Sequence, residues 1–283
     1  LTDATLEGLA IVSHGRIIEA NRQLAALLDM SIEELIGSQP DDWLAAVDGQ
    51  SMVEARARPV EASLRHMQSD IVVEIGTHAI EYRGKQCLVL AVRDLTARKQ
   101  AERRVEHLAA HDALTDLPNR THFTAMLEEM CASGEQFALH ALDLDRFKAV
   151  NDVFGHAAGD VILCRVAEIL RNSVRRHDLV ARIGGDEFLV IQRNVRDVRD
   201  AQHLAQRILS AFETEMDITR DPMAVGVSVG VAVFPNDAST PEMLRHHADF
   251  ALYRAKESGR GMARFFDQDM DRFVRERREL EHD

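Results

Sequence analysis

Two short acidic segments of this sequence contain the residue types that hold divalent cations in proteins. Asp143 and Asp145 follow directly after the apolar run 137–142, and Asp186 and Glu187 follow two glycines that separate two further apolar runs. Carboxylate oxygens are ligands that Mg²⁺ prefers, and a bound Mg²⁺ stabilises both the attacking and the leaving oxygen in phosphoryl chemistry. If the fold brings these segments together, they are suited to metal-dependent nucleotidyl transfer.

A simpler interpretation stays open on residue types and spacing alone. Asp145 would then cap the helix that follows it, and Asp186 with Glu187 would be solvated residues of a turn. The Gly184-Gly185 pair is itself a hairpin signal, because glycine adopts positive φ at little cost. No Gly-x-x-x-x-Gly-Lys-Ser/Thr segment occurs in the sequence, so a P-loop mechanism is not supported.

The apolar pattern predicts the elements that position these segments. Helices and strands alternate from Asp112 onward, which predicts an α/β (α+β) domain. We expect strands at 137–142, 179–183, 188–191 and 225–234, and helices at 160–171, 198–212 and 241–258. Because the Gly-Gly hairpin joins two of these strands, the sheet is not expected to be all parallel.

The first 96 residues show shorter alternating runs, which predict an antiparallel sheet with helices on one side. Strands are expected at 8–12, 16–19, 71–75 and 86–92. Asn21 and Ser31 each precede a short helical pattern, and residues 40–68 are expected to be helical or irregular.

Residues 94–111 form a charged segment without Gly or Pro. Ala101, Val105 and Leu108 lie at four-then-three spacing, which is a short heptad pattern. Two interpretations are equally open: a helical linker that pairs with its copy in a dimer, or a single amphipathic helix that lies on its own domain.

Length and composition limit the classes of function. The 283 residues suffice for about two domains. A net charge of −13 argues against a surface that binds nucleic acid. The apolar run 224–234 is shorter than the roughly 20 residues that span a bilayer, so no membrane segment is expected. The cysteines are expected to be buried, reduced thiols of a cytoplasmic protein, and the missing initial Met suggests a piece of a longer chain.

Four ordered motifs lie between residues 112 and 260. They are Asp112-Ala-Leu-Thr-Asp-Leu-Pro-Asn-Arg120; Asp143-Leu-Asp-Arg-Phe-Lys-Ala-Val-Asn-Asp152, followed by Gly155-His156 and Gly159-Asp160; Gly184-Gly-Asp-Glu-Phe188; and Ala248-Asp-Phe-Ala-Leu-Tyr-Arg-Ala-Lys256, followed by Gly259-Arg260. Together they resemble the GGDEF family of diguanylate cyclases. The resemblance implies a central mixed sheet surrounded by helices, a palm-like fold shared with nucleotidyl cyclases.

The resemblance also implies a reaction and a metal site. Two GTP molecules, one on each subunit of a homodimer, condense to cyclic di-GMP with release of two pyrophosphates. The metal, Mg²⁺ or Mn²⁺, would be bound by Asp143, Glu187 and the carbonyl of Leu144, with Asp186 close by. Asp186 or Glu187 would help to deprotonate the attacking 3′-hydroxyl.

Further positions match the family's substrate and product contacts. Asn151 and Asp160 would recognise the guanine edge and reject adenine, whose polar groups would stay unpaired. The phosphates would be held by Lys148, Lys256 and Arg260, beside the backbone of Phe147 and Leu144. Arg175 and Asp178 match an Arg-x-x-Asp inhibitory site for the product, with Arg207 as a candidate further contact.

The remaining segments resemble signalling modules. Residues 1–96 resemble a PAS sensory domain at 15–21, 31–37 and 92–96, but no residue decides its ligand, which stays unknown. Residues 97–111 would be a signalling-helix linker and 112–267 the GGDEF domain. Residues 268–283 resemble a connector to an EAL phosphodiesterase domain; the alternative is a terminal helix.

Two functions follow from these resemblances. The leading hypothesis is a diguanylate cyclase regulated by the PAS domain and by its product. The alternative is a catalytically silent GTP-binding module that regulates an attached cyclic di-GMP phosphodiesterase. Turnover of GTP distinguishes them.

Overall fold

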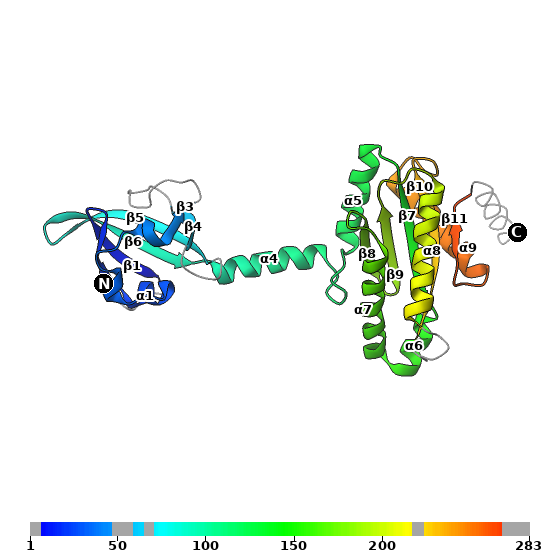
Figure 1. The fold of residues 1–283 in the computed structure, drawn as a ribbon, viewed down its shortest axis with the longest axis horizontal. Coiled ribbons are helices and arrows are strands. Elements are labelled where there is room, and N and C mark those ends of the chain that lie inside the picture. The colour runs from blue at the N-terminus through cyan, green and yellow to red at the C-terminus, as the bar shows by residue number, and fades with distance from the viewer. Residues whose placement is uncertain (1–6, 47–58, 65–70, 217–223, 268–283) are drawn as a thin grey trace, which may run out of the picture. The chain divides into compact units, whose positions relative to one another are not determined.

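The structure is a computed structural model that describes residues 7–46, 59–64, 71–216 and 224–267. The chain divides into two compact units, Leu1–Val105 and Glu106–Asp283 (Figure 1). The expected C-terminal connector at 268–283 lies outside the described residues. No helix in the described ranges is both long enough and apolar enough to span a bilayer.

The first unit is built on a six-stranded antiparallel sheet. Its strand order is β2-β1-β6-β5-β4-β3. The strands are β1 Gly8–Ser13, β2 Arg16–Ala20, β3 Leu44–Ala46, β4 Val60–Leu64, β5 Val72–Tyr82 and β6 Lys85–Asp94. Three short helices follow β2: α1 Arg22–Leu28, α2 Ile32–Leu35 and α3 Pro40–Trp43. The expected antiparallel sheet with helices is therefore confirmed.

Local sequence signals explain where these helices begin. The side chain of Asn21 accepts hydrogen bonds from the backbone N–H groups of Leu24, at 2.9 Å, and Leu9, at 2.8 Å, so it caps α1 and fixes it to β1. Ser31 and Glu34 form a capping box at the start of α2. The prediction for residues 40–68 was wrong at β3 and β4. These strands have three and five residues, too few for an alternating pattern to stand out.

The second unit contains a five-stranded mixed sheet of order β11-β10-β7-β9-β8. The strands are β7 Phe137–Asp145, β8 Leu179–Gly184, β9 Glu187–Gln192, β10 Gly226–Phe234 and β11 Ala263–Phe265. Only the β10–β11 pairing among these is parallel. The helices are α4 Thr96–Ala110, which crosses the division between the units, α5 Arg120–Ser133, α6 Phe147–Phe154, α7 His156–Ser173, α8 Val198–Glu215 and α9 Pro241–Glu257.

Two apolar layers enclose this sheet. Buried residues of α7 and α8 pack on one face together with Leu142 and Phe188. Buried residues of α5 and α9 pack on the other face together with Leu139 and Leu189. This arrangement confirms the expected mixed sheet surrounded by helices. In α4 no described side chain is buried, and Val105 and Leu108 are exposed.

Gly230 in β10 allows α9 to approach the sheet very closely. A Cβ atom at this position would lie 2.2 Å from the Ala248 carbonyl oxygen and 2.2 Å from the Leu252 backbone nitrogen. Both atoms belong to the α9 backbone, so no side-chain rotation could make room. Glycine at residue 230 therefore sets the distance between β10 and α9.

His140 lies within β7 and is completely buried. Its Nε2 atom is 2.9 Å from Oε1 of Gln192, and its Nδ1 atom is buried without a hydrogen-bond partner in the described structure. Burial lowers the pKa of His140 from its usual 6.5 to about 4, because a charged imidazolium would lose its hydration.

Mild acid is therefore expected to destabilise this unit through His140. As the pH falls from 6.5 towards 4, the unfolded chain binds a proton that the folded chain excludes, so stability falls with the pH. The free energy of unfolding falls by about 1.4 kcal/mol for each pH unit below 6.5, so it is about 2 kcal/mol lower at pH 5. Urea unfolding at pH 7 and pH 5 measures it. His140→Leu should lose correspondingly less stability between these pH values, and an equal loss in both proteins would contradict the prediction.

Candidate active site

The two acidic segments meet at the ends of adjacent strands. In the antiparallel pairing of β7 with β9, Asp143 lies directly opposite Glu187. Asp186 occupies the tip of the β8–β9 hairpin, where Gly184 has φ 153° and Gly185 has φ 54°. These backbone angles explain the two glycines, since residues with a Cβ rarely adopt them. The hairpin predicted from the Gly-Gly pair thus presents Asp186 and Glu187 beside Asp143.

Asp143 is half-buried at the end of β7. Its Oδ2 atom lies 2.7 Å from Nζ of Lys256 in α9. Burial raises the pKa of Asp143, the charges of Asp186 and Asp145 raise it further, and the hydrogen bond from Lys256 lowers it. Because the pKa is raised on balance, the single ammonium group does not offset burial and the surrounding negative charge.

This surplus of negative charge fits a divalent cation. In the described residues, no three His, Cys, Asp or Glu side chains already converge as a complete metal site. Mg²⁺ does not need such a set, since it usually takes one or two carboxylates and completes its shell with water and substrate phosphates. Asp143 and Glu187 supply two carboxylates in adjacent positions, and the Leu144 carbonyl belongs to the same strand.

Asp145 has a structural role that its position in the sequence did not reveal. It is buried, and it accepts hydrogen bonds from Ser228 Oγ at 2.8 Å and from the Gly261 N–H at 3.0 Å. Arg260 Nε lies 3.9 Å from Oδ1 of Asp145. The interpretation of Asp145 as a cap of α6 is wrong, because the N-cap position is Arg146. Asp145 instead holds the turn after α9 at the end of β7 through the hydrogen bond from Gly261. This bond positions the neighbouring Arg260.

The two residues predicted to recognise guanine lie on adjoining helices, Asn151 in α6 and Asp160 in α7. Oδ1 of Asn151 is buried and has no hydrogen-bond partner among the described residues. Gly159 makes room for it: a Cβ there would lie 2.0 Å from Oδ1 of Asn151 and 3.1 Å from Cζ of Phe147. An acceptor without a partner is what a site for a hydrogen-bonding ligand requires.

Two cavities adjoin the end of β7. One of about 320 Å³ is lined by Asp143, Glu187 and Lys256, together with Arg245, Asp249 and Tyr253 of α9. The other, of about 490 Å³, is lined by Asp145, Arg146 and Arg260, among others. Lys148 is exposed on α6 and lines neither of these two cavities. The structure therefore brings together Asp143, Glu187 and Lys256 around the smaller cavity, whereas Arg260 lines the larger one.

Asp249 is a candidate site residue that sequence reasoning missed. Its Oδ2 lies 3.8 Å from Nε of Arg245, and both residues line the cavity that contains Glu187. Its position seven residues before Lys256 was the available signal, because residues seven apart share one face of a helix.

Two of the three predicted product-binding residues, Arg175 and Asp178, lie between α7 and β8, and the third, Arg207, reaches the end of α7 from α8. Asp178 accepts hydrogen bonds from the backbone N–H groups of Arg175, at 2.9 Å, and Arg193, at 3.0 Å, and only 1% of its side chain is exposed. Arg207 of α8 donates from Nε to the Ser173 carbonyl at 2.6 Å. Arg175 itself is exposed.

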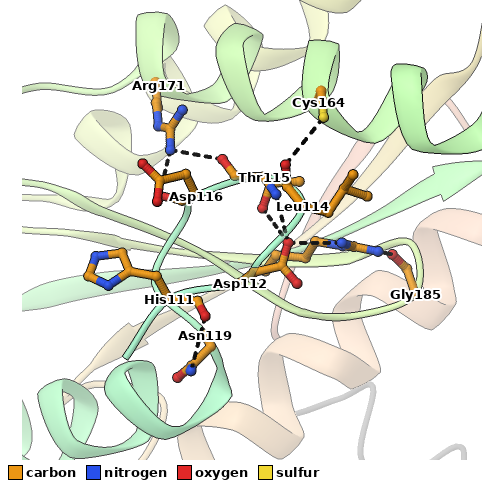
Figure 2. Close-up of polar contacts among 10 residues, drawn as sticks. His111, Asp112, Leu114, Thr115, Asp116, Asn119, Cys164, Arg171 and Gly185 are labelled. Atoms are coloured by element: carbon orange, nitrogen blue, oxygen red, sulfur yellow. Dashed lines mark hydrogen bonds and ion pairs between the residues drawn. The ribbon is translucent and has the colours of Figure 1, made fainter. Parts of the chain in front are cut away.

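A bridge from the segment 112–120 supports the hairpin turn. Arg182 Nη1 donates to Oδ1 of Asp112 at 2.9 Å, while Nε and Nη2 of the same guanidinium donate to the Gly185 carbonyl at 3.1 and 2.9 Å. Figure 2 shows Asp112 and Gly185 at the two ends of this bridge, with Thr115 bonded to the same carboxylate. Arg182 was not singled out from the sequence, since nothing near it indicates a partner 70 residues away.

Similarity to known proteins identifies the family of this chain. Residues 109–262 match the family model described as "Diguanylate cyclase, GGDEF domain". The chain belongs to this family. The matched residues all lie within the second unit, and the first unit lies outside the match.

Relatives and solved structures extend the match. The chain is 37% identical to an "uncharacterized signaling protein" of Caulobacter vibrioides over its whole length, which is 36% of that protein. It is 38% identical to the "bifunctional diguanylate cyclase/cyclic di-GMP phosphodiesterase MucR" of Pseudomonas aeruginosa, over 66% of this chain and 28% of that one. The chain thus spans about a third of the length of these relatives.

A solved structure supports the fold of the second unit. It is the coiled coil and GGDEF domain of DgcB from Caulobacter crescentus in complex with c-di-GMP. It has 28% identity and a TM-score of 0.53, and the match covers 60% of this chain and 93% of that structure. The second unit therefore has the palm-like GGDEF fold.

Proposed function

We propose that the second unit is a diguanylate cyclase that condenses two GTP molecules into cyclic di-GMP and two pyrophosphates. The observation that carries this proposal is the register of β7 with β9, which sets Asp143 opposite Glu187 and beside Lys256. Membership of the GGDEF family supports the same reaction and favours it over a silent GTP-binding module.

Each residue of the site would have a specific role in this reaction. Asp143, Glu187 and the Leu144 carbonyl would hold Mg²⁺ or Mn²⁺, which supplies positive charge for the phosphate oxygens. Lys256, Arg260 and Lys148 would bind the triphosphate beside the backbone of Phe147. Asp186 or Glu187 would accept the proton of the 3′-hydroxyl. The oxygen then attacks the α-phosphorus of the second GTP, and the bond to the β-phosphate oxygen breaks.

Selection of guanine is assigned to Asn151 and Asp160. The unpartnered Oδ1 of Asn151 would accept a hydrogen bond from an N–H group of guanine, and Asp160 would accept another. Adenine presents a different arrangement of donors and acceptors, so at least one buried polar group would stay unpaired with ATP.

Ring closure needs two bound nucleotides facing each other, so we propose that the chain acts as a homodimer. The described part of α4 leaves Val105 and Leu108 exposed, which is consistent with pairing between two copies of this helix. The related DgcB structure contains a coiled coil together with its GGDEF domain.

Feedback by the product is assigned to Arg175 and Asp178, with Arg207 beside them. Arg175→Ala is expected to weaken inhibition by cyclic di-GMP at least about tenfold, because a charged contact to phosphate is lost. The initial rate should stay within about twofold of wild type. Initial rates at increasing cyclic di-GMP concentrations measure both quantities, and an unchanged inhibition constant would remove this assignment.

We assign regulation to the first unit as a PAS sensory domain, on the basis of its antiparallel sheet and of helices packed against it. MucR, whose name combines both activities, supports an EAL phosphodiesterase domain in the whole protein. We place the protein in the cytoplasm because Cys87, Cys131 and Cys164 are free thiols.

Incubation of the chain with GTP and Mg²⁺ tests the proposed function. Bound product must first be stripped, and a high protein concentration favours the dimer. We expect cyclic di-GMP and two pyrophosphates per product molecule, and no cyclic product from ATP. Binding of GTP without turnover under these conditions would overturn the cyclase assignment.

A further inference from the structure

The last turn of α4 is held against the segment 112–120 by a histidine and a carboxylate. His107 Nε2 lies 2.6 Å from Oδ1 of Asp116. The bond to His107 lowers the pKa of Asp116, so this carboxylate is ionised at neutral pH and accepts the hydrogen from His107. Because both side chains are largely exposed, the pair itself stabilises the fold very little.

Two further imidazole rings extend from this contact. The rings of His107 and His111 stack with their centroids 4.0 Å apart, and His122 of α5 meets the ring of His111 edge-on at 5.8 Å. The ring stack therefore lies beside the hydrogen bond between His107 and Asp116. The last turn of α4 is therefore in contact with Asp116 through His107 and with α5 through the ring of His111.

Asn119 closes the same junction from the other side. Its backbone N–H donates to the Ala110 carbonyl at 2.9 Å, and its Nδ2 donates to the Ala109 carbonyl at 2.9 Å. Its Oδ1 accepts from the His122 N–H at 3.1 Å and so caps α5. One side chain thus ends α4 and begins α5.

From Asp116 the contacts continue to the candidate active site. Arg171 of α7 donates to the carbonyls of Thr115 and Asp116 at 2.9 and 2.6 Å, as Figure 2 shows. Thr115 is bonded to Asp112, whose carboxylate receives Arg182, and Arg182 holds the Gly185 carbonyl. An unbroken series of hydrogen bonds therefore joins His107 of α4 to the turn that carries Asp186 and Glu187.

We propose that the His107–Asp116 pair is a positioning contact through which the last turn of α4 controls the geometry of the Gly184–Glu187 turn. This inference rests on the proposed cyclase function, and it assigns to α4 a route of control over that site. When the pair is closed, the segment 112–120 is held in one place and Arg182 can fix the Gly185 carbonyl. When α4 turns or withdraws, Asp116 is released and the hairpin tip loses part of its support.

Paired substitutions in the whole chain separate the hydrogen bond from the ring stack. His107→Phe keeps a ring against His111 but removes the N–H donor, whereas His107→Gln removes the ring and keeps a donor. We expect the rate of cyclic di-GMP formation to fall about threefold in His107→Phe and in Asp116→Ala, and to stay near wild type in His107→Gln. KM for GTP should not change. Glu102→Gln, which breaks an exposed ion pair elsewhere on α4, is the matched control and should have no effect.

Hydrogen–deuterium exchange gives a readout that does not need catalysis. In His107→Phe, the backbone amides of residues 184–188 should exchange at least about threefold faster than in wild type and in His107→Gln. If the wild-type chain made no cyclic di-GMP, the cyclase assignment would fall, and the exchange data would still decide the positioning role. Equal exchange and equal rates in His107→Phe and wild type, or an equal loss in His107→Gln, would overturn it.

Discussion

Replacing Asp143 or Glu187 with alanine is expected to reduce the formation of cyclic di-GMP at least about 100-fold. These two carboxylates face each other across the β7–β9 pairing and are the proposed metal ligands. Removing one of them leaves the cation held by a single side chain, and the charge that it supplies to the reacting phosphate is lost. Initial rates with GTP and saturating Mg²⁺ measure the effect.

Stability measurements distinguish this loss from unfolding. The pKa of Asp143 is raised, mainly by burial, so the folded state gains no net stability from its negative charge. Asp143→Asn should therefore lose activity while its melting temperature stays equal to or above that of wild type. Glu242→Gln, at an exposed position of α9, provides a control that should change neither property. Substantial synthesis by Asp143→Ala or Glu187→Ala would refute the metal assignment.

The second large effect is expected at a residue that touches no ligand. Gly230→Ala places a Cβ 2.2 Å from two backbone atoms of α9, and neither atom can move without moving the helix. We expect a loss of roughly 3 kcal/mol or more in the free energy of unfolding, as for other overpacked interior positions. Because α9 carries Lys256, which pairs with Asp143, activity should fall as well.

A glycine in the other sheet provides the control for this experiment. Gly76 in β5 has no heavy atom within 4 Å of the position that a Cβ would take. Gly76→Ala should change the free energy of unfolding by less than about 1 kcal/mol. Denaturant unfolding followed by circular dichroism compares the two variants. Similar stability of Gly230→Ala and wild type would show that α9 does not depend on this close approach.

Features of the site that depend on neighbouring residues were predictable from the sequence. The Gly-Gly hairpin follows from local backbone preferences, and the strand 137–142 follows from its apolar run. Together they imply that Asp186 and Glu187 sit at a strand end. The pairing of β9 with β7, which sets Glu187 opposite Asp143, is known only from the structure. The long helices could also be predicted, because many turns repeat the same pattern.

Contacts between distant residues could not be predicted in this way. Arg182 reaches Asp112 across 70 residues, and Asp145 receives the N–H of Gly261 across 116 residues. Neither contact leaves a periodic signal, since each depends on how separate elements pack. The short strands β3 and β4 were missed for another reason, because their pairing partners rather than their own composition make them strands.

The junction at Asn119 has a mechanical consequence. Since one amide group closes the last turn of α4 and opens the first turn of α5, little slack separates the two helices. A rotation of α4 about its own axis is then transmitted to α5, because no flexible loop between the two helices absorbs it. If the chain between Ala110 and Asn119 were lengthened by a few residues, α4 would rotate without moving α5.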